Sequence, residues 1–218
     1  MSDAGMNERD PRFWNTHDDA DTGKKGHHHM SFADWLNVQQ QAHLSFGERL
    51  SLVTDWHAPT PDVEWDVTAL VMHVIEEQQW VPLLLAGRTV GEARSRLEPI
   101  GDDLVSEWQR YSRAATNAWA SVDPDAMVNL SYDTVRASAY LREQASDVIV
   151  HTWDLARAVG ADEELGEALV EAAWTVFEPQ KDTLEASGLF ASPVPIDENA
   201  SLQSRLLALT GRDDRIAA

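Results

Sequence analysis

Segments that repeat apolar residues at helical spacing run through most of this chain, and they constrain its fold more than any other feature. They predict long helices over about residues 31–56, 66–86, 103–121, 135–159 and 163–187, and shorter helices over about 91–97 and 202–209. Proline and glycine mark the connections, and residues 128–132 fit a strand or an extended loop. Long helices with short loops and hardly any alternating pattern predict an all-α fold, a helical bundle.

The amino-terminal residues differ from the rest of the sequence. Residues 1–30 are rich in Asp, Asn, Gly and Lys, and they show no sustained hydrophobic period. We expect them to form a disordered leader, so that the folded domain begins near Ser31. With 218 residues, the chain is long enough for one domain with a substantial core.

Charge and cysteine content exclude several classes of function. The chain carries a formal net charge of −20, and such a polyanion repels nucleic acids and anionic membrane surfaces. It has no cysteine, which excludes disulfides, zinc–thiolate sites and an intrinsic thiol nucleophile. The sequence has neither a signal-peptide pattern nor an apolar run of membrane-spanning length. We therefore expect a cytoplasmic protein without nucleic-acid or membrane partners.

A carboxylate and an imidazole lie four residues apart in the segment 147–156. Positions i and i+4 of a helix share one face, so Asp147 and His151 can point at one metal ion. His73 lies on or beside the core-facing stripe of another predicted helix and would complete the site. Three protein ligands with an open position are typical of a catalytic zinc site. The alternative is that these are hydrogen-bonded core residues, because such short motifs also occur by chance.

Other residues near these positions have more than one interpretation. Glu77 follows His73 by four residues, so it is a fourth ligand, an acceptor for a ligating imidazole, a general base, or a residue at the mouth of the bundle without such a role. We favour the acceptor or base role over direct ligation. We expect Asp154 to pair with Arg157 at i+3 rather than to take part in catalysis. Trp80 and Trp153 are core residues or else line a pocket beside the proposed ligands.

Several motifs resemble, in order, those of the actinobacterial DinB-like metal-binding proteins related to the N-terminal domain of mycothiol-dependent maleylpyruvate isomerase. The similar segments cover about residues 31–213: Pro59–Thr60–Pro61 with Trp65, Leu70 and His73 with Trp80, Leu84–Arg88, Gly101–Asp103, Asp147 with His151–Ala158 and Gly160, Pro193–Pro195, Ala200, Arg205–Leu209 and Gly211–Arg212. There are two departures. Asp62 stands where the family often has cysteine, and the isomerase has an additional C-terminal domain, so we do not transfer maleylpyruvate isomerisation.

The resemblance implies a DinB-like four-helix bundle over residues 31–213, with additional short helices and at most a minor strand element. It implies that His73, Asp147 and His151 hold a divalent transition metal on the second and fourth helices of the bundle. Zinc is the expected ion, and nickel or iron fit the same ligands because the ligand set alone does not choose.

The resemblance also favours one class of function and leaves others open. It implies a metal-dependent enzyme that uses a small thiol, mycothiol, for transfer to or isomerisation of a small electrophile, with Glu77 moving a proton. A metal-dependent hydrolase is the nearest chemical alternative. A non-catalytic metal-binding or ligand-sensing module is the alternative from another class, because fold does not decide function. A homodimer is compatible with such a bundle.

Overall fold

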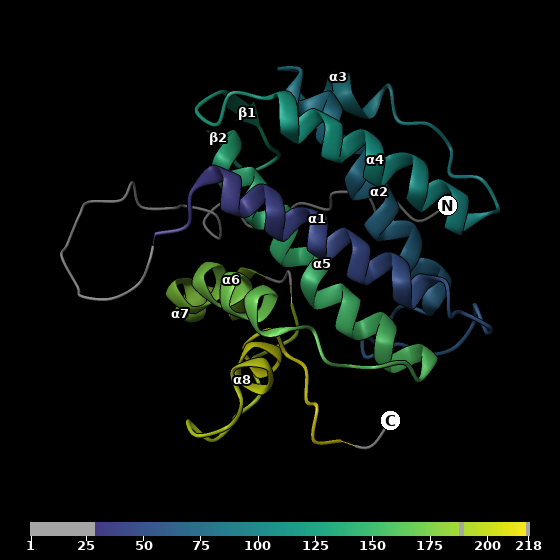
Figure 1. The fold of residues 1–218 in the computed structure, drawn as a ribbon, viewed down its shortest axis with the longest axis vertical. Helices are drawn as coiled ribbons and strands as arrows, with labels where there is room; N and C mark the ends of the chain where they lie inside the picture. Colours follow the sequence, from purple (N-terminus) through teal and green to yellow (C-terminus); the bar gives the residue numbers. More distant parts are fainter. Residues whose placement is uncertain (1–28, 188–189, 217–218) are drawn as a thin grey trace.

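Four long helices form the body of the protein. The structure is a computed structural model that describes residues 29–187 and 190–216. Within it, α1 (Phe32–Leu50), α2 (Val67–Leu85), α4 (Leu104–Ser121) and α5 (Ala137–Val159) make up a four-helix bundle (Figure 1). Both α1 and α2 pack against α4 and α5. The all-α bundle predicted from the sequence is confirmed, whereas residues 1–28 of the predicted leader lie outside the described residues.

Short elements surround this bundle. Helix α3 (Val90–Arg94) follows α2, and an antiparallel hairpin of β1 (Met127–Asn129) and β2 (Thr134–Arg136) leads into α5. Helix α6 (Glu167–Phe177) packs on α5 and on α8 (Leu202–Leu209). A 3-10 turn (Glu178–Gln180) and α7 (Lys181–Ser187) lie between α6 and α8, and these carboxyl-terminal helices gather on one side of the bundle (Figure 1).

Capping residues in the sequence define the starts of the bundle helices. Ser31 caps α1 in a reciprocal capping box with Asp34. Asp66 and Asp103 cap α2 and α4, each accepting a hydrogen bond from a backbone amide three residues later. Helix α5 ends at Gly160, which adopts the left-handed conformation. These local signals explain why the predicted starts of α1, α2 and α4 and the predicted end of α5 lie within a few residues of the observed ones.

Two predicted helices differ from the observed ones. Helix α1 ends at Leu50 rather than near Trp56, because turn bonds from the amides of Leu52 and Val53 follow it. The helix predicted over 163–187 is divided into α6, the 3-10 turn and α7. Pro179 lies in that turn, and since proline has no amide hydrogen it cannot continue the helical ladder. The extended segment predicted at 128–132 is the first half of the hairpin.

The core lies where the bundle helices meet. Residues at helical spacing on α4 and α5 are buried there: Leu104, Trp108, Tyr111, Ala115 and Trp119 on α4, and Leu141, Ala145, Val148, Thr152 and Leu155 on α5. The ring of Trp119 packs edge-on against Tyr140, joining α4 to α5. Among the described helices, none is both long and apolar enough to cross a membrane.

A small polar cluster interrupts this core between α1, α2 and α4. The side-chain amide of Gln39 lies 3.0 Å from Nδ1 of His43 and donates to the hydroxyl of Thr116 at 2.9 Å. Burial lowers the pKa of His43 to about 3, against a smaller opposing effect of a hydrogen bond with Gln78. His43 is therefore neutral in the folded protein at any pH at which the fold is ordinarily studied.

We expect His43 to make the protein less stable in mild acid. The unfolded chain binds a proton on His43 below about pH 6.5 and the folded chain does not, so stability falls as pH decreases through this range. Between pH 7 and pH 5 the loss is about 2 kcal/mol from this residue. Urea unfolding of wild type and His43→Gln at pH 7 and pH 5 measures this loss of unfolding free energy. An equal pH dependence in the two proteins would contradict the assignment.

Candidate metal centre

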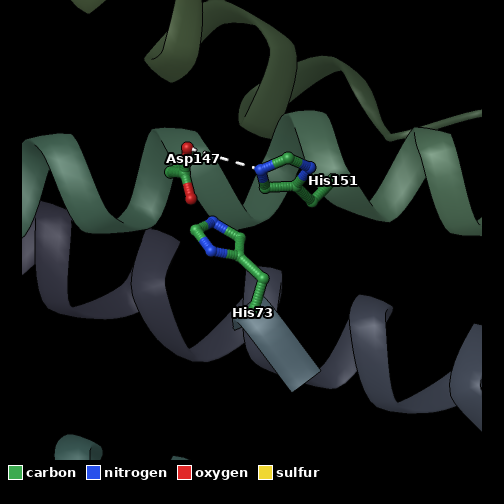
Figure 2. Close-up of side chains that lie close together, drawn as sticks. All are labelled: His73, Asp147 and His151. Carbon is green, nitrogen blue, oxygen red and sulfur yellow. Dashed lines mark ion pairs between the residues drawn. The ribbon is translucent and has the colours of Figure 1, made fainter. Parts of the chain in front are cut away.

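His73, Asp147 and His151 meet where α2 faces α5. Figure 2 shows the imidazole of His73 pointing from α2 toward the two side chains of α5. One ligand atom from each residue lies within 4.8 Å of the other two. His151 is buried, while His73 and Asp147 are half-buried. The structure thus brings together the three residues that the sequence singled out, and among the described residues this is the group of His and acidic side chains suited to a metal ion.

The spacing of these atoms fits a small divalent ion after modest side-chain adjustment. Nε2 of His151 lies 3.6 Å from Oδ1 of Asp147 (Figure 2). Metal–ligand bonds of about 2.0–2.1 Å at tetrahedral angles place two ligands about 3.4 Å apart, which this pair nearly matches. The His73 and His151 rings meet edge-on, with centroids 5.4 Å apart. Two imidazole nitrogens and one carboxylate oxygen within 4.8 Å of one another are the kind of donors that bind zinc, so the three residues fit a divalent metal ion.

The second nitrogen of His151 contacts Asp154. Nδ1 lies 3.0 Å from Oδ2 of Asp154, whose side chain is fully buried. The predicted pairing of Asp154 with Arg157 is wrong, because Arg157 instead forms an ion pair with Glu163 at 2.9 Å. Residues i−3 and i+3 of a helix are equally close to Asp154, and here the imidazole is the partner.

Arg212, from the segment after α8, completes this arrangement. Its Nε and Nη2 donate to Oδ1 and Oδ2 of Asp154 at 3.0 and 2.7 Å. Arg212 belongs to a segment that resembles the family but was not predicted as a site residue, and only the fold brings it to Asp154, 58 residues away along the chain. Its one sequence signal is the Gly211–Arg212 step that follows the last apolar helix.

The charges of these residues shift their pKa values in opposite directions. Burial by itself lowers the pKa of His151, but the carboxylates of Asp147 and Asp154 outweigh burial and raise it. Burial raises the pKa of Asp154, and the charge of Arg212 with hydrogen bonds from Arg212 and His151 brings it below its ordinary range. Asp154 is therefore an anion, and it accepts hydrogen bonds from both neighbours.

Trp65 forms an aromatic wall beside the two histidines. Its ring centroid lies 4.7 Å from that of His73 and 5.9 Å from that of His151. The turn before α2 holds it: its amide donates to the carbonyl of Asp62, and its own carbonyl accepts from Thr60. Trp80 and Trp153, the two tryptophans near the ligands in sequence, are buried core residues. Of the two interpretations of Trp80 and Trp153, the core one is confirmed, and Trp65 is the tryptophan that lies beside the histidines.

Glu77 lies one helical turn beyond His73 and is buried. Its Oε2 accepts a hydrogen bond from Nε2 of Gln144 at 3.1 Å, which adds a second polar contact between α2 and α5. Gln144 precedes Asp147 by three residues, so this contact lies beside the His–Asp–His cluster. The placement suits a residue near the metal ligands, and the role of Glu77 as a base stays a prediction.

A cavity of about 720 Å³ lies elsewhere, between α1 and α4. Leu44, Trp108, Arg113 and Thr116 are among the side chains that line it, with His43 as its one histidine. None of the three cluster residues lines this cavity, so the cavity and the His73–Asp147–His151 cluster are separate features of the structure.

Comparison with known proteins identifies the bundle. Proteins from two strains of Mycobacterium tuberculosis, both named as uncharacterized, are 29% identical over 192 residues, which cover 84% of this chain and all of theirs. The crystal structure of a mutant of mycothiol-dependent maleylpyruvate isomerase matches the fold with a TM-score of 0.53 at 20% identity. The match covers 66% of this chain and 68% of that one.

A family model agrees with the structural match and spans the cluster. The model for the mycothiol maleylpyruvate isomerase N-terminal domain matches residues 36–156, more than half of the chain. This match contains His73, Asp147 and His151 and leaves Arg212 outside. The chain belongs to the family of the mycothiol maleylpyruvate isomerase N-terminal domain.

Proposed function

We propose that this protein is a metal-dependent enzyme that joins a small thiol to an electrophile, as an S-transferase or a thiol-dependent isomerase. The observation that carries the proposal is the convergence of His73, Asp147 and His151 from two helices. Family membership supports a thiol of the mycothiol type as cosubstrate. The chain has no cysteine, so the thiol must come from outside.

The three residues supply the ligands for a divalent ion, for which zinc is the first candidate and nickel or iron are alternatives. A bound ion of this kind would favour the deprotonated form of a thiol and polarise a carbonyl group. With neutral imidazoles, the three ligands carry only the negative charge of Asp147, which a divalent ion reverses, while the charges of Asp154 and Arg212 balance each other. The loaded site would therefore attract an anion such as a thiolate.

The remaining residues of the site handle the substrate and the proton. Trp65 offers a flat apolar surface beside the two imidazoles, against which a small unsaturated electrophile can lie. We assign to the Glu77 carboxylate the role of accepting the proton that the thiol releases on deprotonation. In an isomerase the thiolate adds to a carbon–carbon double bond conjugated to a carbonyl, whose oxygen takes the displaced electron pair as an enolate. Rotation about the new single bond and expulsion of the thiolate restore the double bond, and the protonated Glu77 returns the proton to the thiolate.

Turnover with and without thiol tests this proposal. Full-length protein loaded with Zn²⁺ is assayed against a panel of unsaturated carbonyl compounds, with and without a low-molecular-weight thiol, beside Asp147→Asn. We expect turnover of at least one compound only when the thiol is present, and loss of that turnover in Asp147→Asn. Turnover without thiol would indicate a hydrolase. Bound metal with no turnover of any compound would indicate a binding module.

Trp65 gives a test of where the metal binds that does not depend on activity. Co²⁺ quenches indole emission by energy transfer that falls steeply with distance, and Trp65 contacts both histidines. We expect Co²⁺ to quench wild-type fluorescence, and Trp65→Phe to remove the largest single share of that quench. Trp174→Phe on α6 is the matched control, with a quench close to that of wild type. A Trp65→Phe protein that quenches like wild type would place the ion elsewhere.

A further inference from the structure

Asp154 and Arg212 form an ion pair that contacts the cluster through His151, but neither residue is one of the three proposed metal ligands. Asp154 is 0% exposed and Arg212 is 9% exposed, so both charges are removed from water. A buried ion pair adds little to stability compared with apolar residues of similar volume, because the desolvation of both charges offsets their attraction. Stability alone therefore gives a weak reason for this pair, and its contact with His151 suggests another.

The contact fixes how His151 uses its two ring nitrogens. An ionised carboxylate only accepts hydrogen bonds, so Nδ1 of His151 carries the proton that points to Asp154. Nε2 is then the nitrogen turned toward Asp147, at 3.6 Å, and toward the cluster with His73. A carboxylate on the far nitrogen also orients a ligating imidazole and raises its basicity.

Arg212 in turn fixes Asp154. Two of its guanidinium nitrogens donate to the two carboxylate oxygens, and the third, Nη1, donates to the backbone carbonyl of Thr210 at 2.6 Å. The turn that delivers it depends on Gly211, which has a φ of +82°. A Cβ on Gly211 would lie 2.5 Å from the carbonyl oxygen of Ala191, so no larger residue fits there.

We propose that Asp154 and Arg212 are positioning residues, through which the segment after α8 holds His151 in the orientation that binds metal. The carboxyl-terminal segment then contributes to metal binding by orienting His151, although it lies outside the region matched by the family model. This inference rests on the proposed function only in that a metal binds at the cluster, and it does not depend on which reaction follows.

Arg157 provides a matched control for the anchoring of that segment. It also joins α5 to the carboxyl-terminal residues, donating to the backbone carbonyls of Asp213, Asp214 and Ile216. Its carboxylate partner is Glu163, however, and not Asp154. A purely structural role of the segment would make Arg157 and Arg212 equally important for metal binding, whereas the positioning role concerns Arg212 alone.

Zn²⁺ affinity, measured by competition with a chromophoric chelator, tests the inference on Asp154→Asn, Arg212→Lys and Arg157→Lys. We expect Asp154→Asn to bind Zn²⁺ about 10–100-fold more weakly than wild type, as for other partners of ligating histidines. Arg212→Lys keeps the positive charge but loses the paired hydrogen bonds to both oxygens of Asp154, so we expect its Zn²⁺ affinity to lie between those of Asp154→Asn and wild type. Arg157→Lys stays within about twofold of wild type, because its contacts do not reach His151.

The absorption spectrum of bound Co²⁺ distinguishes a displaced ligand from a weaker fold. We expect Asp154→Asn to change the band shape near the visible maximum, and Arg157→Lys to leave it unchanged. Wild-type affinity in Asp154→Asn, or an equal loss in the two arginine variants, would overturn the inference. If Asp154→Asn fails to fold, the comparison of the two arginine variants decides. Wild type that binds no Zn²⁺ would instead contradict the proposed function.

Discussion

Replacing His73 with alanine is expected to leave the purified protein without stoichiometric metal. The variant retains only Asp147 and His151, two ligands on adjacent turns of one helix. Loss of a hydrogen-bonding partner of a ligand already weakens metal binding by about 10–100-fold, so loss of a ligand should cost more than about 100-fold. Elemental analysis of protein purified without an affinity tag measures this directly. We expect near one metal per chain for wild type and much less for His73→Ala.

His57→Ala is the matched control for this comparison. His57 is exposed, pairs with Asp66 at 3.1 Å and is not one of the three cluster residues. The sequence also holds consecutive histidines at His27–His29, and wild type and both variants share them, so the difference between proteins reports the cluster alone. Equal metal in wild type and His73→Ala would place the metal elsewhere and remove the basis of the proposed function.

The parts of the site that depend on helix geometry could be predicted from the sequence. Asp147 and His151 share a face because they are four residues apart on one helix, and the periodicity around them fixes that face toward the bundle. The helical period also placed His73 on or beside a core-facing stripe, which made it the candidate third ligand. The family resemblance added that it faces Asp147 and His151, since a helix pattern shows which side is buried but not which helix it meets. The structure confirms that the three residues meet.

Contacts formed by loops and by the end of the chain could not be predicted in this way. Arg212 reaches Asp154 because α6 packs on α5 and α8 packs on α6, and no local sequence pattern encodes these contacts. Trp65 lies in an irregular turn whose shape depends on hydrogen bonds to Thr60, so helical periodicity did not place it beside the histidines. Both residues lie beside the His73–Asp147–His151 cluster, where tertiary contacts rather than secondary structure decide what each side chain touches.

Removing the guanidinium of Arg212 is expected to cause the largest loss of folding stability among the changes considered. In Arg212→Met, Asp154 remains buried at 0% exposure without its cationic partner, and breaking a buried pair from one side costs about 3–5 kcal/mol. Urea unfolding of the metal-free protein at pH 7 measures this loss. Arg157→Met is the control, and its loss should be smaller because Glu163, at 32% side-chain exposure, stays partly solvated.

The double variant Asp154→Leu/Arg212→Met separates stability from positioning. Apolar residues in place of both members of a buried ion pair are often neutral or stabilising, so we expect this variant to recover most of the stability lost by Arg212→Met alone. It still lacks an acceptor for Nδ1 of His151, so its Zn²⁺ affinity should stay about 10–100-fold below wild type. A double variant that regains both stability and affinity would show that the pair only supports the fold. One that regains stability alone would show that the pair is retained for the orientation of His151.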